Sequence, residues 1–222
     1  MEMSNLKNES PAQKKKRASE IVKLLKRKFP DDPGTELHYK TPLDLLVATI
    51  LSAQATDKRV NMVTERLFKK YRTAADYAHA KQEEFEAEIR ETGFYRNKAK
   101  SVIGMAQALL TKHGGEVPRT MEELVGLPGV GRKTANLILG IVFGEPGIVC
   151  DTHVIRVSQR LGLTGNKDPE KIERDLTALI PDKEWTGFSS RLIVLGRYTC
   201  TARHPAHHDC PLVKACPSAT LI

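Results

Sequence analysis

Apolar residues recur at helical spacing along almost the whole chain, and this pattern constrains the fold more than any other feature. Ile21, Leu24, Leu25 and Phe29 fall on one helical face, and similar faces follow through the sequence. No segment keeps the apolar–polar alternation of a strand, and proline and glycine separate the periodic segments at short intervals. The sequence therefore predicts an all-α protein of about ten helices joined by short loops.

Local signals predict where several of these helices begin. Thr41 before Pro42, and Asp168 before Pro169, are each an N-cap residue followed by proline at the first helical position. The helix after Pro42 is apolar nearly all round, which is typical of a buried helix. Residues 185–195 form the last long periodic segment.

The chain of 222 residues carries a formal net charge of +8, which favours polyanionic partners such as nucleic acid. No stretch approaches the ~20 apolar residues of a membrane span, and the N-terminus has no apolar signal region. We therefore expect a cytoplasmic, nucleoid-associated protein with no membrane partner. Residues 1–16 are expected to be a flexible basic tail, whose run Lys14–Arg17 is either solvated or an arm that contacts phosphates.

The segment Leu127–Ala135 contains two glycines two positions apart, followed by a helical pattern. Such glycines let the backbone turn sharply and direct amide N–H groups at an anion. In a basic, all-helical protein the expected anion is a DNA phosphate, bound by five residues of the turn and the helix start: Gly129, Val130, Gly131, Arg132 and Thr134. The alternative is an ordinary turn between two helices.

The longer string resembles the helix-hairpin-helix of the endonuclease III family of DNA glycosylases. The match continues through residues 149–154 and 196–200, and through Leu51–Asp57 near the first connector. The resemblance covers roughly residues 20 to 216, which makes chance a poor explanation.

The resemblance implies two α-helical domains that flank a DNA-binding cleft. One is a six-helix domain that holds the helix-hairpin-helix, over residues 35–145. Residues 17–34 and 146–222 would form the second domain, of the iron–sulfur type, with a C-terminal Cys/His metal loop.

The resemblance also implies catalytic residues. Lys133 matches the family's catalytic lysine, whose neutral amine attacks C1′ of the sugar, expels the damaged base and forms a Schiff base. Asp151 matches the catalytic carboxylate, which stabilises the positive charge that develops on the sugar. The alternatives are a surface lysine near a helix start and an aspartate that only caps the helix it begins.

By the same resemblance, two residues would fill the gap left by a flipped base. Gln54 is one wedge, and Phe94 is the second, at a position where many relatives have leucine. A core residue after a helix end is the alternative for Phe94. His153 is expected to contact the damaged base or a phosphate, with a helix-surface histidine as the alternative.

The family's C-terminal loop carries four cysteines, spaced C-x6-C-x2-C-x5-C, around a [4Fe–4S] cluster. Cys200, Cys210 and Cys216 occupy the first, third and fourth positions, and His207 occupies the second. Three readings remain: an iron–sulfur cluster with His207, His208 or water as the fourth ligand; a Cys3His zinc site; or loss of the metal. The loop would present Arg203 and His204, assisted by Lys214, to the phosphate backbone.

The sequence thus predicts a base-excision repair enzyme that acts on double-stranded DNA as a monomer. It would remove oxidised pyrimidines such as thymine glycol and cleave the abasic site by β-elimination. Rival hypotheses are activity on oxidised purines, cleavage of abasic sites alone, a non-catalytic DNA-binding protein with a structural metal loop, and an iron–sulfur or zinc interaction protein.

Overall fold

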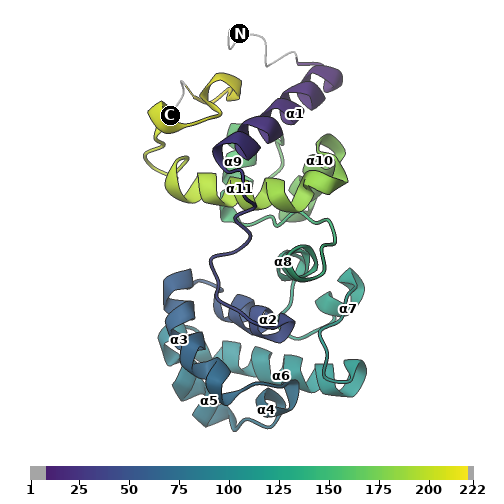
Figure 1. Ribbon diagram of the computed structural model, residues 1–222, viewed down its shortest axis with the longest axis vertical. Helices are drawn as coiled ribbons and strands as arrows, with labels where there is room; N and C mark the ends of the chain where they lie inside the picture. Colours follow the sequence, from purple (N-terminus) through teal and green to yellow (C-terminus); the bar gives the residue numbers. More distant parts are fainter. Residues whose placement is uncertain (1–8, 220–222) are drawn as a thin grey trace. The chain divides into compact units, whose positions relative to one another are not determined.

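The computed structural model describes residues 9–219, and within that range the chain forms eleven α-helices, short 3-10 helices and no strand (Figure 1). The predicted all-α fold is confirmed. The α-helices are α1 (Pro11–Lys28), α2 (Pro42–Leu51), α3 (Asp57–Lys70), α4 (Ala74–Ala78), α5 (Gln82–Ile89), α6 (Tyr95–His113), α7 (Met121–Val125), α8 (Arg132–Val142), α9 (Thr152–Arg160), α10 (Pro169–Leu179) and α11 (Trp185–Tyr198). Among the described residues, no helix is both long and apolar enough to cross a membrane.

The chain divides into two compact units, each with its own hydrophobic core. Unit 2 is Glu36–Glu145 and holds α2 to α8. At its centre lies α2, in which every residue from Leu43 to Leu51 is buried, as the apolar pattern predicted. α2 contacts α3, α6 and α8, so it ties the helices that carry the functional turns to one core.

The start of α2 follows from its capping residues. Thr41 caps the helix through its side chain, and Asp44 returns a bond to the backbone N–H of Thr41, which forms a capping box. Pro42 occupies the first turn, where its missing N–H costs nothing. The predicted helix start is therefore confirmed, and so is the Asp168 cap of α10.

The longest helix of unit 2, α6, packs against α4 and α5. Tyr71, Tyr77 and Phe85 form an aromatic cluster in the same core. The helix ends at Gly114, whose φ of 62° is in the left-handed region that suits glycine. α6 thus packs against the core, and a turn lies at each of its ends.

Unit 1 contains the remaining described residues, with α1, α9, α10 and α11 around a second core. α11 contacts α9 and α1, and α1 also contacts α10 (Figure 1). The guanidinium of the buried Arg191, on α11, donates to the carbonyl of Phe29 at 2.8 Å, at the end of α1. This bond fixes the end of the first helix against the last long one.

α1 begins earlier than expected. Residues 1–8 of the expected tail lie outside the described residues, but Pro11–Lys16 are already helical, so the expectation of a flexible tail is wrong there. Ser10 accepts a bond from the N–H of Gln13, whose side chain bonds the N–H of Ser10 in return. This capping box, together with proline in the first turn, explains the early start.

Candidate functional site

The turn between α7 and α8 requires glycine at position 129 for two reasons. Its φ is +77°, and a Cβ built there would lie 2.7 Å from Cβ of Ser101, on α6. Any side chain would therefore be strained and would clash with a neighbouring helix. The N–H of Val130 bonds the carbonyl of Leu127 at 3.1 Å, which closes the turn, and the Val130 side chain is buried.

The start of α8 leaves its first amides without a side-chain cap. The N-cap residue is Gly131, which has no side chain, and the first turn contains no acidic residue. Arg132 and Lys133 lie there instead, although cations are disfavoured near the positive end of a helix dipole. Amides and two cations at one helix start suit an anionic ligand. This arrangement favours the phosphate site over an ordinary turn.

Lys133 is exposed at the second position of α8, whereas Thr134 beside it is buried. No group in the described part of unit 2 forms an ion pair with the Lys133 amine. The turn that precedes Lys133 packs against α6. A Cβ built at Gly104, on α6, would lie 3.4 Å from Cβ of Pro128 in the turn. The accessible amine of Lys133 is therefore carried by a helix start that packs against α6.

Gln54 and Phe94 are the two non-glycine residues with positive φ in the described chain, at 55° and 49°. Left-handed backbone costs an ordinary residue roughly 1–2 kcal/mol. Such strain gathers where a side chain must be presented at a functional turn. Gln54 follows the end of α2, and Phe94 is the N-cap of α6.

Both side chains point into solvent. Phe94 is 63% exposed, and Gln54 is also exposed. The alternative that Phe94 is a core residue is therefore wrong. An exposed ring held on a strained turn is suited to insertion between bases.

Asp151 is the N-cap of α9. Its Oδ1 atom accepts bonds from the N–H groups of His153 and Val154, both at 2.8 Å. Because both bonds use Oδ1, the cap does not occupy Oδ2. One carboxylate can therefore start a helix and still offer an oxygen to chemistry. Asp151 belongs to unit 1, and Lys133 to unit 2.

His153 is half-buried and packs against the end of α11. A Cβ at Gly196 would lie 2.9 Å from Cβ of His153. Its Nδ1 atom lies 3.3 Å from the guanidinium of Arg156, which also donates to the carbonyls of Gly196 and Cys200. This packing distinguishes His153 from a free helix-surface histidine.

Three cysteines and one histidine line a small cavity in the C-terminal loop. Cys200, His207, Cys210 and Cys216 all contribute to its wall, together with Arg160. His208 is exposed and does not line it, so His207 is the better-placed fourth donor. The described residues contain no group of three or more His, Cys, Asp or Glu side chains gathered tightly enough to hold a metal ion.

Arg160, in the last turn of α9, holds the first part of this loop. Its guanidinium donates to the carbonyls of Thr201 at 2.7 Å and Ala202 at 2.8 Å. It also lies 3.3 Å from the sulfur of Cys200. Arg160 therefore supports both the loop and its first candidate ligand.

Burial shifts the pKa of the other two cysteines of the loop. Burial raises the pKa of Cys210 and of Cys216, and nearby Cys200 adds to both increases. Binding a metal would therefore have to displace protons from both. Cys150, next to Asp151, is buried outside this cluster, and burial raises its pKa to about 12. That thiol stays protonated and acts as a small apolar core residue.

Arg203 and His204 are exposed on a short turn of the same loop, and Lys214 is exposed further along. The hydroxyl of Thr201 donates to the carbonyl of His204 at 2.7 Å, and the N–H of Ala206 bonds the carbonyl of Thr199 at 2.8 Å. The C-terminal loop thus presents basic side chains to solvent from a hydrogen-bonded frame.

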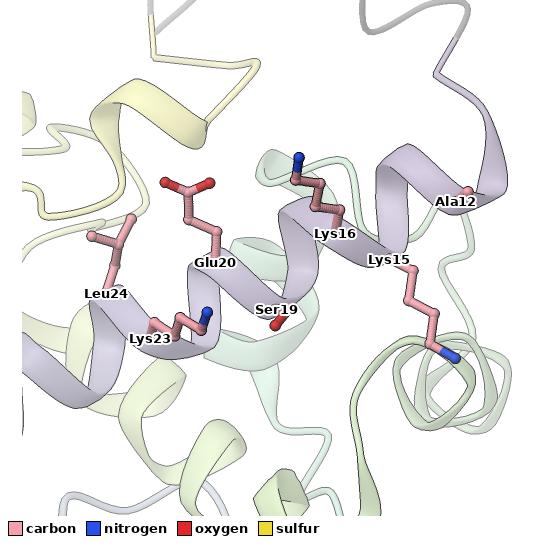
Figure 2. A pocket seen from close by; sticks show the side chains of 7 residues that line it. All are labelled: Ala12, Lys15, Lys16, Ser19, Glu20, Lys23 and Leu24. Atoms are coloured by element: carbon pink, nitrogen blue, oxygen red, sulfur yellow. The ribbon is translucent and has the colours of Figure 1, made fainter.

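The lysines of α1 make a looser arrangement. Lys15, Lys16 and Lys23 are exposed and surround a shallow hollow with Ser19 and Glu20. Figure 2 shows Lys15 and Lys16 leaving the helix in different directions, with the carboxylate of Glu20 nearby. Arg17, the last residue of the basic run, pairs with Glu9. Side chains that do not converge fit a solvated face better than a built site.

The chain is similar to known proteins over most of its length. Residues 47–182 match the family described as HhH-GPD superfamily base excision DNA repair protein. Endonuclease III of Synechocystis sp. is 51% identical over 94% of this chain and 95% of its own. Endonuclease III of Bacillus subtilis is 46% identical over 82% and 83%. A solved structure of endonuclease III trapped as a covalent intermediate with DNA, an estranged-adenine complex, superposes with a TM-score of 0.89 at 44% identity, over 93% of this chain and 97% of that one.

Proposed function

Because the chain belongs to the HhH-GPD superfamily of base excision DNA repair proteins, and within it to the endonuclease III family, we propose that it excises oxidised pyrimidines such as thymine glycol from double-stranded DNA and then cleaves the strand at the abasic site. The observation that carries this proposal is the start of α8. There an exposed lysine sits beside uncapped amides on a glycine turn.

Lys133 is the nucleophile of the proposed reaction. Its neutral amine attacks C1′, and the bond between C1′ and the base breaks with its electron pair leaving on the base. The sugar ring then opens, and the nitrogen is held as a Schiff base to C1′. Loss of a proton from C2′ expels the 3′ phosphate by β-elimination, and water releases the lysine. Because the nitrogen stays bound through both steps, one residue accounts for both activities.

Asp151 is the proposed carboxylate. As the base departs, positive charge develops on the sugar, and a fixed anion stabilises that charge. The helix cap holds the carboxylate through Oδ1, so its orientation is set before DNA binds. Preorganisation of this kind supplies much of the rate enhancement at such sites.

DNA binding divides into phosphate contacts and base extrusion. We assign phosphate contacts to hairpin residues 129–132 and 134, and to Arg203 and His204. Gln54 and Phe94 would occupy the gap in the stack, since both are exposed on left-handed turns. His153 would approach the damaged nucleotide from the first turn of α9.

We propose that Cys200, His207, Cys210 and Cys216 hold a [4Fe–4S] cluster rather than a single zinc ion. Six, two and five residues separate these four positions in turn, which is the spacing that the resembled family uses around such a cluster. A cluster spreads its ligands over several iron atoms, which suits donors spaced around a cavity. The group supplies no step of the cleavage. Its ligands fix the loop that bears Arg203 and His204.

The test is a comparison of lesions in otherwise identical duplexes. One duplex carries thymine glycol, a second 8-oxoguanine and a third a preformed abasic site. We expect base release followed by cleavage on the first duplex, cleavage on the third and little reaction on the second. Cleavage of the third alone would reduce the protein to an abasic-site lyase, and no cleavage of any would contradict the proposed chemistry.

A further inference from the structure

Lys98 is a buried lysine on α6 that the proposed chemistry does not use. Its side chain is only 5% exposed, and its amine donates to the main-chain carbonyl of Thr92 at 2.7 Å. Burial lowers the pKa of this amine. Lysines are seldom buried so fully unless a specific partner holds them. Here the partner is a backbone carbonyl rather than a carboxylate, so Lys98 fixes a piece of main chain.

The carbonyl that Lys98 holds lies immediately before the turn that presents Phe94. The next two residues both have positive φ, 70° at Gly93 and 49° at Phe94. A Cβ at Gly93 would meet nothing within 4 Å, so the backbone angle rather than space requires glycine. The ring of Phe94 is exposed, so burial of the ring does not hold the turn either.

The hydrogen bonds around the turn come from its two sides. On one side, the buried hydroxyl of Thr92 donates to the carbonyl of Ile89 at 2.8 Å. On the other side, the main-chain N–H of Lys98 bonds the carbonyl of Phe94 at 3.1 Å. The amine of Lys98 thus binds the carbonyl of Thr92, which precedes the two residues of positive φ. The main-chain N–H of Lys98 binds the carbonyl of Phe94, the second of these two residues. Strained turns persist only where the surroundings fix them in this way.

We propose that Lys98 is a positioning residue, which fixes the turn of Thr92, Gly93 and Phe94 and so sets how Phe94 enters the base stack. This inference rests on the proposed function, in which Phe94 fills the gap left by the flipped base. Lys98 itself touches neither the base nor the sugar in this account.

The first experiment measures extrusion apart from chemistry. A duplex carries thymine glycol with 2-aminopurine beside it, whose fluorescence rises when the lesion leaves the stack. Lys98→Met keeps the stem but removes the donor, and we expect it to slow extrusion by about tenfold or more. Borohydride trapping on a single-stranded abasic oligonucleotide should stay within about twofold, because a single strand offers no duplex gap to fill. Lys100→Met, an exposed lysine on the same helix, should change neither.

A double-mutant cycle with Phe94→Ala separates positioning from a general structural role. If Lys98 acts through Phe94, the variant with both substitutions extrudes the lesion no more slowly than Phe94→Ala alone. Lys98→Arg, which keeps a charged donor, should recover part of the rate. Multiplied losses in the double variant would overturn the proposal, and so would a wild-type extrusion rate in a folded Lys98→Met protein.

Should Lys98→Met fail to fold, Gly93→Ala disturbs the same turn while leaving the amine in place. The proposal predicts the same pattern for it, slow extrusion with trapping retained, and extrusion at the wild-type rate would overturn it. Extrusion precedes the chemistry, so it is read independently of Lys133. A wild-type protein that extrudes the lesion but traps no abasic strand would contradict the proposed function and leave the role of Lys98 standing.

Discussion

Asp151 combines a structural and a chemical task in one carboxylate, and the two tasks can be separated by substitution. The helix cap needs a side-chain acceptor, which asparagine also supplies. The developing charge on the sugar needs an anion, which asparagine lacks. Asp151→Asn should therefore keep its stability and lose activity, whereas Asp151→Ala should lose activity and part of its stability.

We expect Asp151→Asn to change the free energy of unfolding by less than about 0.5 kcal/mol, and Asp151→Ala to lower it by about 1 kcal/mol. Single-turnover base release should fall by roughly a hundredfold or more in both variants. Urea unfolding and release kinetics measure the two effects. Base release by Asp151→Asn near the wild-type rate would leave Asp151 with only its cap.

Substitution of Gly129 gives a second prediction at the scale of residues. Gly129→Ala places a side chain at a φ of +77° and 2.7 Å from Cβ of Ser101. Strain and clash together should lower the free energy of unfolding by about 2–3 kcal/mol, as thermal unfolding would record. Adding Ser101→Gly removes the clash but not the strain, so it should recover only part of the loss. Full stability in Gly129→Ala would show that the turn needs no glycine there.

At the scale of residues, the sequence could assign a role only where a motif carries it. The exposure of Phe94 fits the wedge role implied by resemblance, but its left-handed backbone could not be foreseen, because phenylalanine disfavours that region. Lys98 gave no signal either, since an isolated lysine in a helical pattern reads as a surface residue. Its burial arises from packing between elements that are distant in sequence.

At the scale of elements, the helices that were predicted have long apolar periods or proline after the cap. The bounds of two helices of five residues, α4 and α7, could not be predicted from periodicity, because each helix is shorter than two turns. Thr73 and Thr120 cap them, with an acidic residue three positions later in each case. That capping pattern, like the Ser10 cap of α1, was the local signal that could have located these helices.

Substitutions in the C-terminal loop, residues 200–216, give the prediction at the scale of elements. In the proposed site His207→Ala leaves three cysteines, whereas His207→Cys restores a fourth thiolate. We expect iron content per protein to fall in His207→Ala and to match the wild type in His207→Cys, measured by metal analysis after purification without added metal. His208→Ala, at the exposed neighbour, is the control. Stoichiometric zinc in the wild-type protein would contradict the cluster.

For the molecule as a whole, the net charge of +8 favours binding to DNA, and the number of phosphate contacts sets how steeply the affinity falls with salt. The structure distinguishes cations that belong to a hydrogen-bonded frame from those on a solvated helix face. Arg203 belongs to the first kind and Lys15 to the second. Composition alone could not make this distinction, because both residues contribute the same charge.

Arg203→Gln should make the slope of log affinity against log salt less steep by about 0.9, since one phosphate contact is lost. Lys15→Gln changes the net charge equally and should leave the slope unchanged. Fluorescence anisotropy with a labelled duplex at several salt concentrations measures both. Equal changes in the two variants would mean that overall charge, rather than the loop, sets the contacts.

The proposed chemistry requires the amine of Lys133 to become covalently attached to the sugar of the damaged nucleotide. The most direct test is borohydride reduction during reaction with a thymine-glycol duplex, followed by proteolysis and mass spectrometry of the DNA-linked peptide. We expect one adduct, on Lys133, in the wild-type protein and in Lys100→Ala, and none in Lys133→Ala. An adduct on another residue, or one that persists in Lys133→Ala, would contradict it.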